Sequence, residues 1–310
     1  MNGPLYDRLT AANPVDPTDP LAGWRKHVRA FLAAGYDYST VMGSDLAFPA
    51  GKRPSEKTVS LNEGAVITDR ATFQSYPWPN PDGCDSSLLD LLDDELPKGA
   101  KLVVWGPGGI LENVIRLVGY ERLCLLLADD PVLARDIFDA VGSRFIRYYE
   151  ICAQFDTVGA LISNDDWGFK TQPMLSPADL RRYVFPWHKR IVEVIHAAGK
   201  PAILHSCGNF DQIIDDVIDD MRYDGKHSFE DTILPVEQAY ERWAGRIAVL
   251  GGIDMDFICR SSPRDVRRRS SEMLARSAGR GGYALGTGNS VPEYVPQENY
   301  FAMLSAAGAP

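Results

Sequence analysis

The sequence is poor in cysteine, in positive charge and in long apolar runs. Its 310 residues include 5 cysteines and carry a formal net charge of −10. An odd number of scattered cysteines does not suit a disulfide scaffold and indicates a reducing compartment. Binding to a nucleic acid needs a basic stripe, which the chain lacks, so we expect no DNA or RNA partner.

No apolar run approaches the roughly 20 residues that a membrane span requires. The first residues, MNGPLYDRLTAANPVDP, contain no apolar segment typical of a signal peptide. We therefore expect a cytoplasmic protein without a membrane partner, acting on a small molecule. Since 45% of the residues are hydrophobic, the chain can bury a large core.

Short β-branched runs alternate with longer helical patterns, which is typical of parallel strands joined by helices. One helix is predicted over residues 177–198, with Ser176 and Asp179 as a capping box and a kink at Pro186. The predicted strands are 38–43, 100–106, 158–164, 201–206, 222–228, 246–252 and 281–287, with an eighth in 64–70. We predict a single-domain α/β protein, a closed (β/α)₈ TIM barrel over 21–310 that follows an N-terminal extension over 1–20. An open dinucleotide-binding sheet is disfavoured because WGPGGILEN lacks the full glycine spacing.

Polar side chains follow almost every predicted strand. In a barrel these positions meet at the carboxyl ends of the strands, where the active site lies. A single aspartate there is most often a helix cap or a turn residue, so the convergence of many such groups is the signal. When several acids are buried together, the pKa of some of them rises, so one cleft contains both protonated and ionised carboxyl groups for acid and base chemistry. The residues are Ser44, Asp45, Glu112, Asn113, Asn164, Asp165, Asp166, His205, Cys207, His227, Glu230, Asp254, Thr287 and Asn289.

The segment HSCGN places His205 and Cys207 two residues apart after an apolar run. Alternate residues of an extended segment point the same way, so both could bind one Zn²⁺, with Glu230 or His227 as a further ligand. Alternatively, His205 donates to a backbone carbonyl and Cys207 packs as a small apolar group. The residues alone leave both interpretations open.

Three other features are less specific. Trp167, Phe169 and Trp187 could line a pocket for a flat ligand or lie in the core. The GPGG turn after Trp105 could bind an anion through its backbone N–H groups or form an ordinary turn. The loop GKRPSEK at 51–57 is a short basic cluster, either a solvated excursion or an anion gate.

Three long segments together resemble the uroporphyrinogen decarboxylase superfamily. They are LISNDDWGFKTQPMLSPADLRRYVFPWHKRIVEVIHAAGKPAILHSCGN, LGGIDMD and GYALGTGNSVPEYVPQENYFAML. The resemblance covers most of the chain and implies a (β/α)₈ barrel. It also implies one of two activities. One is decarboxylation of uroporphyrinogen without a cofactor; the other is zinc-dependent methyl transfer from a corrinoid protein to a thiol.

The decarboxylase pattern is matched at one residue. Asp45 in GSDLA resembles the aspartate that holds the pyrrole nitrogens of the substrate. The decarboxylases also have an Arg-x-x-x-Arg segment that grips substrate carboxylates, and we expect nothing between Met1 and Gly35 to resemble it. Thr287 stands where they have a histidine between two glycines.

The methyltransferase pattern is matched at His205 and Cys207, while Thr287 stands where those enzymes have a third, cysteine ligand. Glu230 is then the expected third ligand, and Cys259 is a poorer substitute. Our leading hypothesis is a corrinoid-linked methyltransferase or demethylase component, with Asp166, His227 and Glu230 as acid, base or ligand. Asp45, Glu112, Trp167 and Asn289 would bind the substrate. A decarboxylase and a non-catalytic module that binds a corrinoid protein are the alternatives, and a homodimer stays open.

Overall fold

The strands form one parallel sheet in a computed structural model that describes residues 2–51 and 60–308. Their order in the sheet, β1 to β7, is their order in the sequence. They are β1 (Tyr38–Met42), β2 (Lys101–Trp105), β3 (Val158–Asn164), β4 (Ala202–His205), β5 (Gly225–His227), β6 (Ala248–Leu250) and β7 (Tyr283–Ala284). The seven main strand predictions are therefore confirmed in position, and so is the parallel α/β class.

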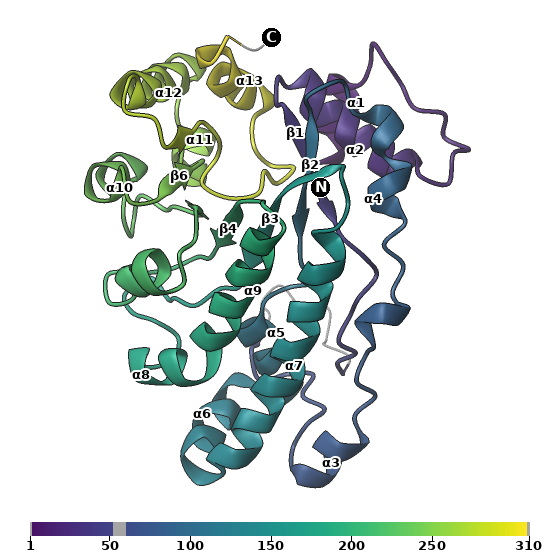
Figure 1. Cartoon of the computed structure of the whole chain (residues 1–310). Helices are drawn as coiled ribbons and strands as arrows, with labels where there is room; N and C mark the ends of the chain where they lie inside the picture. The colour runs from purple at the N-terminus through teal and green to yellow at the C-terminus, as the bar shows by residue number, and fades with distance from the viewer. Residues whose placement is uncertain (1, 52–59, 309–310) are drawn as a thin grey trace.

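Helices surround the strands, as Figure 1 shows. The first half of the chain contains α1 (Gly3–Leu9), α2 (Ala22–Ala33), α3 (Arg70–Ser75), α4 (Leu88–Leu91), α5 (Ile110–Val118), α6 (Tyr120–Asp129) and α7 (Pro131–Cys152). The second half contains α8 (Pro177–Asp179), α9 (Phe185–Ala197), α10 (Val236–Trp243), α11 (Met255–Arg260), α12 (Pro263–Ser277) and α13 (Gln297–Ala306). Short 3₁₀ turns lie at Pro81–Gly83 and Asp93–Glu95, and π-helical turns at Leu180–Val184 and Asp216–Asp220. In the described part of the chain, no helix has the length and hydropathy needed to span a membrane.

The sheet is curled but stays open within the described residues, since β1 and β7 are each paired on one side only. The expected eighth strand at 64–70 does not form. The N–H groups of Val66 and Ile67 in that segment both donate to the carbonyl of Leu117, near the end of α5. The fold is therefore that of a TIM-like barrel, and the prediction of full closure by a strand at 64–70 was wrong.

The predicted helix at 177–198 is confirmed as α8, a π-helical turn and α9. The Ser176 hydroxyl accepts a hydrogen bond from the Asp179 N–H at 3.1 Å, as a helix cap does. Pro186 stands in the first turn of α9, directly after the π-helical turn. Proline cannot donate a backbone hydrogen bond, and the wider turn before it accommodates that loss.

The predicted N-terminal extension packs on the C-terminal part of the chain. Asn2 caps α1 by accepting from the Leu5 N–H, and its side-chain amide donates to the carbonyl of Pro292. Leu5 is buried in a small apolar cluster with residues of α12 and α13, such as Val266 and Met303. The domain boundary at residue 20 remains a prediction.

Two tyrosines of α7 are hydrogen-bonded to the backbone at or near the carboxyl ends of the first three strands. The Tyr148 hydroxyl donates to the carbonyl of Trp105 at the end of β2 and accepts from the N–H of Gly43 after β1. The Tyr149 hydroxyl donates to the carbonyl of Ile162 in β3. Because both side chains are fully buried, these bonds fix the edge of the sheet on which the polar loops stand.

Candidate functional site

Three side chains that follow β3 and β4 come together at the carboxyl edge of the sheet. A ligand atom from each of Asp166, His205 and Cys207 lies within 4.8 Å of the other two. The strand register explains the meeting, because Asn164 at the end of β3 pairs with His205 at the end of β4. The Cys207 N–H also donates to Asp166 Oδ1 at 2.8 Å, which fixes the carboxylate beside the thiol.

Hydrogen bonds define the tautomers of a histidine pair. His205 Nδ1 lies 2.7 Å from His227 Nδ1, and His227 Nε2 lies 3.2 Å from the carbonyl oxygen of Thr287. A carbonyl only accepts, so His227 carries its proton on Nε2. Burial lowers the pKa of His227 to about 3, so the ring is neutral and its Nδ1 accepts from His205. His205 Nε2 is left with a free lone pair.

The sulfur of Cys207 has two polar neighbours. The Ser228 hydroxyl lies 3.2 Å from Sγ, and the side-chain amide of Asn289 donates to Sγ at 3.5 Å. Burial and the nearby charge of Asp166 raise the pKa of the Cys207 thiol to about 11, against the opposing effect of these two hydrogen bonds. The free protein therefore holds a thiol at neutral pH, and a bound cation is needed to make it a thiolate.

Glu112 supplies a protonated carboxyl group to the same region. Burial, together with the negative charges of Asp165 and Asp166, raises its pKa to about 8. Asp165 itself is fully buried and accepts hydrogen bonds from the N–H groups of Leu111 and Glu112. It also bonds His188 at 3.0 Å. This buried aspartate therefore attaches the first turn of α5 to the end of β3 and places Glu112 near Asp166.

The GPGG turn does not form an anion-binding nest. The N–H of Gly106 donates to Asn164, that of Gly108 to the carbonyl of Gly106, and that of Gly109 to Glu112. Glycine is needed at position 109 for another reason, because a Cβ there would lie 2.1 Å from Asp165 Oδ1. The turn serves close packing, and its donors are occupied.

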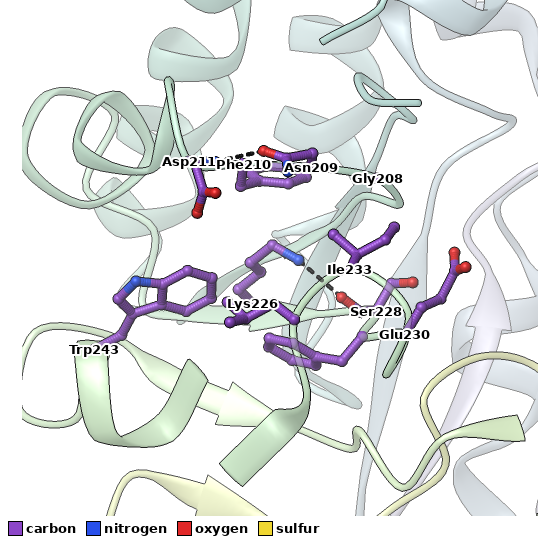
Figure 2. Close-up of a pocket in the computed structure, with 11 residues that line it drawn as sticks. Gly208, Asn209, Phe210, Asp211, Lys226, Ser228, Glu230, Ile233 and Trp243 are labelled. Atoms are coloured by element: carbon purple, nitrogen blue, oxygen red, sulfur yellow. Dashed lines mark hydrogen bonds between the residues drawn. The ribbon is translucent and has the colours of Figure 1, made fainter. Parts of the chain in front are cut away.

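Two of the predicted site residues lie elsewhere. Trp167 is fully buried against the rings of Phe185, His188 and Phe210, so it belongs to the core and not to a substrate pocket. Glu230 is not in the donor group, and its side chain lines a neighbouring pocket (Figure 2). Asp166 occupies the place that we expected for Glu230.

Other predicted residues have different partners from those expected. Both ring nitrogens of His227 are hydrogen-bonded, to His205 and to the carbonyl of Thr287, which differs from the acid, base or ligand role expected for it. Asp45 is exposed, accepts from the Asp85 N–H at 2.8 Å and also neighbours the Cys84 thiol. Asp254 caps α11, and Cys259 lies within that helix, outside the donor group. Residues 52–57 of the basic loop lie outside the described residues.

A buried lysine beside the site was missed by the sequence analysis. Lys226 in β5 is 2% exposed and donates to the carbonyls of Ser206 and Ser228, at 3.2 and 2.9 Å. Its ammonium group also lies over the rings of Phe210 and Phe229. Burial lowers its pKa to about 7. The sequence signal was a lysine within a predicted strand, next to His227. In the structure this lysine stands at the centre of β5.

Arg25 and Arg29 on α2 have the Arg-x-x-x-Arg spacing of the segment found in decarboxylases, so the expectation that nothing between Met1 and Gly35 resembles it was wrong. Arg29 makes two hydrogen bonds to the carboxylate of Glu95, at 2.7 and 2.8 Å. Arg25 contacts Glu95 and also pairs with Asp19 and Asp94. Their charges are thus paired with carboxylates of the protein itself.

A parallel, curled α/β sheet with nitrogen, sulfur and oxygen donors at its carboxyl edge defines a TIM-like barrel protein with a candidate metal centre. The family model described as "Uroporphyrinogen decarboxylase (URO-D)" matches residues 39–309. The chain belongs to this family, which confirms the resemblance seen in its sequence.

Curated relatives agree with this family assignment, and solved structures agree with the fold. Uroporphyrinogen decarboxylase of Anaeromyxobacter dehalogenans (strain 2CP-C) is 27% identical over 278 residues, covering 86% of this chain and 76% of the relative. Uroporphyrinogen decarboxylase of Thermus thermophilus is 30% identical over 185 residues, covering 58% of this chain and 50% of the relative. Two structures share the fold alone. One is a methyltransferase from Methanosarcina mazei, with a TM-score of 0.66 and 16% identity, covering 97% of this chain and 90% of that one. The other is a putative vitamin-B12 independent methionine synthase from Listeria monocytogenes, with a TM-score of 0.56 and 11% identity, covering 100% of this chain and 93% of that one.

Proposed function

We propose that this protein transfers a methyl group, as the methyltransferase or demethylase component of a corrinoid-linked system, and holds Zn²⁺ through Asp166, His205 and Cys207. The observation that carries the proposal is the grouping of three different metal-ligand atoms within 4.8 Å. A small molecule would be the methyl donor or acceptor, and a corrinoid protein the partner. The sheet edge with the polar loops is where both would meet.

The donor set suits zinc, which accepts imidazole nitrogen, thiolate sulfur and carboxylate oxygen in tetrahedral sites. From zinc–ligand bond lengths of about 2.0–2.3 Å, the ligand atoms of such a site lie roughly 3.5 Å apart. Atoms at most 4.8 Å apart therefore need to close by about 1 Å when the ion binds. Three protein ligands also leave a fourth position for a substrate, as catalytic zinc sites do.

Each donor is already oriented by a second group, which is typical of metal centres. His227 accepts from His205 Nδ1 and so leaves Nε2 to bind. Asn289 contacts the sulfur of Cys207, and the backbone N–H of Cys207 holds one oxygen of Asp166. Asn289, expected to bind substrate, thus supports the thiol. Thr287 acts through its carbonyl, so its side chain need not replace the missing cysteine.

Bound zinc would stabilise the deprotonated form of a thiol acceptor or polarise the oxygen of a methyl donor. Residues of the chain would release and donate the protons that the reaction requires. Cys207 has to lose its proton before it can bind a metal, so affinity for the ion should rise with pH. Glu112 is protonated at neutral pH and near Asp166, and could donate its proton to a leaving oxygen. Asp45 could position the substrate at the rim.

Metal titration tests the proposal. The metal-free wild-type protein should bind one Zn²⁺ per chain, and Cys207→Ser should weaken binding because a hydroxyl is a poor substitute for thiolate. Glu230→Gln is the matched control and should bind as the wild type does, since Glu230 lies outside the donor group. Absence of stoichiometric binding, or equal affinity of the wild type and Cys207→Ser, would rule out the zinc centre.

A cofactor-free decarboxylase is the second candidate, favoured by the names of the 27–30% identical relatives and by Asp45 at the rim. The cations needed for a substrate with many carboxylates are a weak point, because Arg25 and Arg29 are ion-paired. An assay with uroporphyrinogen separates the two functions. Turnover that Asp45→Asn abolishes, in protein free of metal, would favour decarboxylation.

A further inference from the structure

Lys226 lies between two loops that meet at the site. One loop follows β4 and contains Ser206 and Cys207, and the other follows β5 and contains Ser228. The ammonium group donates to the backbone carbonyls of Ser206 and Ser228, and Figure 2 shows it directed at the second loop. Within the described residues no carboxylate lies at ion-pair distance from it. Its polar partners in the structure are therefore these two carbonyls.

Ser228 has an unusual backbone. Its φ is +87°, a left-handed conformation that residues with a side chain rarely adopt. Such a conformation persists where the surroundings hold it, and it is frequent at functional sites. Here the Ser228 carbonyl accepts from Lys226, and the following N–H, that of Phe229, donates to Gly288 at 3.1 Å. The result is that the Ser228 hydroxyl lies 3.2 Å from the sulfur of Cys207.

We propose that Lys226 is a positioning residue that ties the loops after β4 and β5 together and thereby sets the place of the Cys207 sulfur in the metal centre. Lys226 bonds the carbonyl of Ser206, which belongs to the peptide directly before Cys207, and the carbonyl of Ser228, whose hydroxyl contacts the Cys207 sulfur. The inference rests on the proposed function insofar as it concerns the metal. The tie itself is a property of the metal-free protein.

The geometry explains why a lysine is used. Two buried carbonyls from different loops both face the interior beside β5, and each needs a donor. One ammonium group has three N–H donors and can therefore bond both carbonyls at once. The rings of Phe210 and Phe229, 4.3 and 4.6 Å from Nζ, exclude water and attract the cation. Removal of the amine would leave both carbonyls without a donor and free the loops to move apart.

The test is the pair of variants Lys226→Met and Lys200→Met. Lys200 is a matched control, because its ammonium also donates to two backbone carbonyls, those of Ala153 and Phe155, beside the opposite end of β4. Co²⁺ titration is followed through the thiolate-to-cobalt absorption band. Lys226→Met should weaken Co²⁺ binding by about 10- to 100-fold and reduce the band, as loss of a group that orients a ligand does. Lys200→Met should keep the wild-type affinity.

Hydrogen–deuterium exchange of the metal-free proteins is the second measurement. Segments 206–210 and 228–231 should exchange at least about tenfold faster in Lys226→Met, because local opening of these loops becomes easier. They should be unchanged in Lys200→Met. Unchanged exchange in both loops, or unchanged Co²⁺ binding, would overturn the proposed role of Lys226. A wild-type protein that binds no Co²⁺ would contradict the metal centre, while the exchange experiment would still decide on the tie. Should Lys226→Met not fold, Lys226→Gln, which is too short to span both carbonyls, takes its place with the same expected losses.

Discussion

The carboxyl group of Glu112 should make the protein less stable as the pH rises through the neutral range. Its pKa in the folded protein is about 8, against an ordinary value of 4.5, because of burial and the charges of Asp165 and Asp166. Between these values the folded state binds more protons than the unfolded state, so the free energy of unfolding falls as pH increases. Below about pH 4.5 both states are protonated, and above about pH 8 the loss is complete.

The magnitude follows from the same numbers. One pKa unit corresponds to about 1.4 kcal/mol, so the full difference between 4.5 and 8 amounts to about 5 kcal/mol. Because the group keeps some access to solvent, we expect about 2 to 4 kcal/mol at pH 9. Glu112→Gln cannot ionise and retains an acceptor for the Gly109 N–H, which makes it the suitable comparison.

Urea unfolding of the wild type and of Glu112→Gln at pH 5, 7 and 9 provides the assay. The two proteins should have similar stability at pH 5. The variant should become the more stable by about 2 to 4 kcal/mol at pH 9, because it avoids a buried charge. A difference between the two proteins that does not depend on pH would refute the assignment of a protonated carboxyl to Glu112.

Two further predictions concern the groups behind the site. His227→Leu should weaken zinc binding by about 10- to 100-fold, since it removes the acceptor that sets the tautomer of His205; His196→Leu, on α9, is the control, and equal zinc affinity of the two variants would contradict the tautomer assignment. Gly109→Ala should lower the free energy of unfolding by about 1 to 3 kcal/mol, because its Cβ meets Asp165. Gly23→Ala on α2, where a Cβ meets nothing within 4 Å, should raise it by up to about 1 kcal/mol, and a similar loss of stability in both glycine variants would show that the contact with Asp165 is unimportant.

The strands and the long helix were predictable because their signals are local. The capping pair Ser176 and Asp179 and the proline at 186 mark the helix by chemistry that acts within one turn. The segment 64–70 has a β-branched pattern as well, but two of its N–H groups are taken by Leu117 of α5. That competition comes from a contact distant in the sequence, which a local pattern does not contain.

The site was predictable in its location and less so in its members. His205 and Cys207 follow one strand and point the same way, a consequence of strand geometry. The choice between Asp166 and Glu230 depends on how far each loop bends after its strand, and both loops carry acids. Trp167 shows the same difficulty, because an aromatic residue after a strand can turn to either side. The burial of Lys226 contradicts the usual preference of lysine for solvent, so no hydrophobicity pattern could reveal it.

The link between His227 and Thr287 has a consequence for substitutions at position 287. Position 287 supports the imidazole pair through a main-chain oxygen, which is present whatever residue stands there. A substitution of Thr287 therefore leaves the acceptor for His227 Nε2 in place, so that His205 keeps its tautomer. What such a substitution removes is the hydrogen bond from the Thr287 hydroxyl to the carbonyl of Asn289, the residue whose amide contacts the sulfur of Cys207.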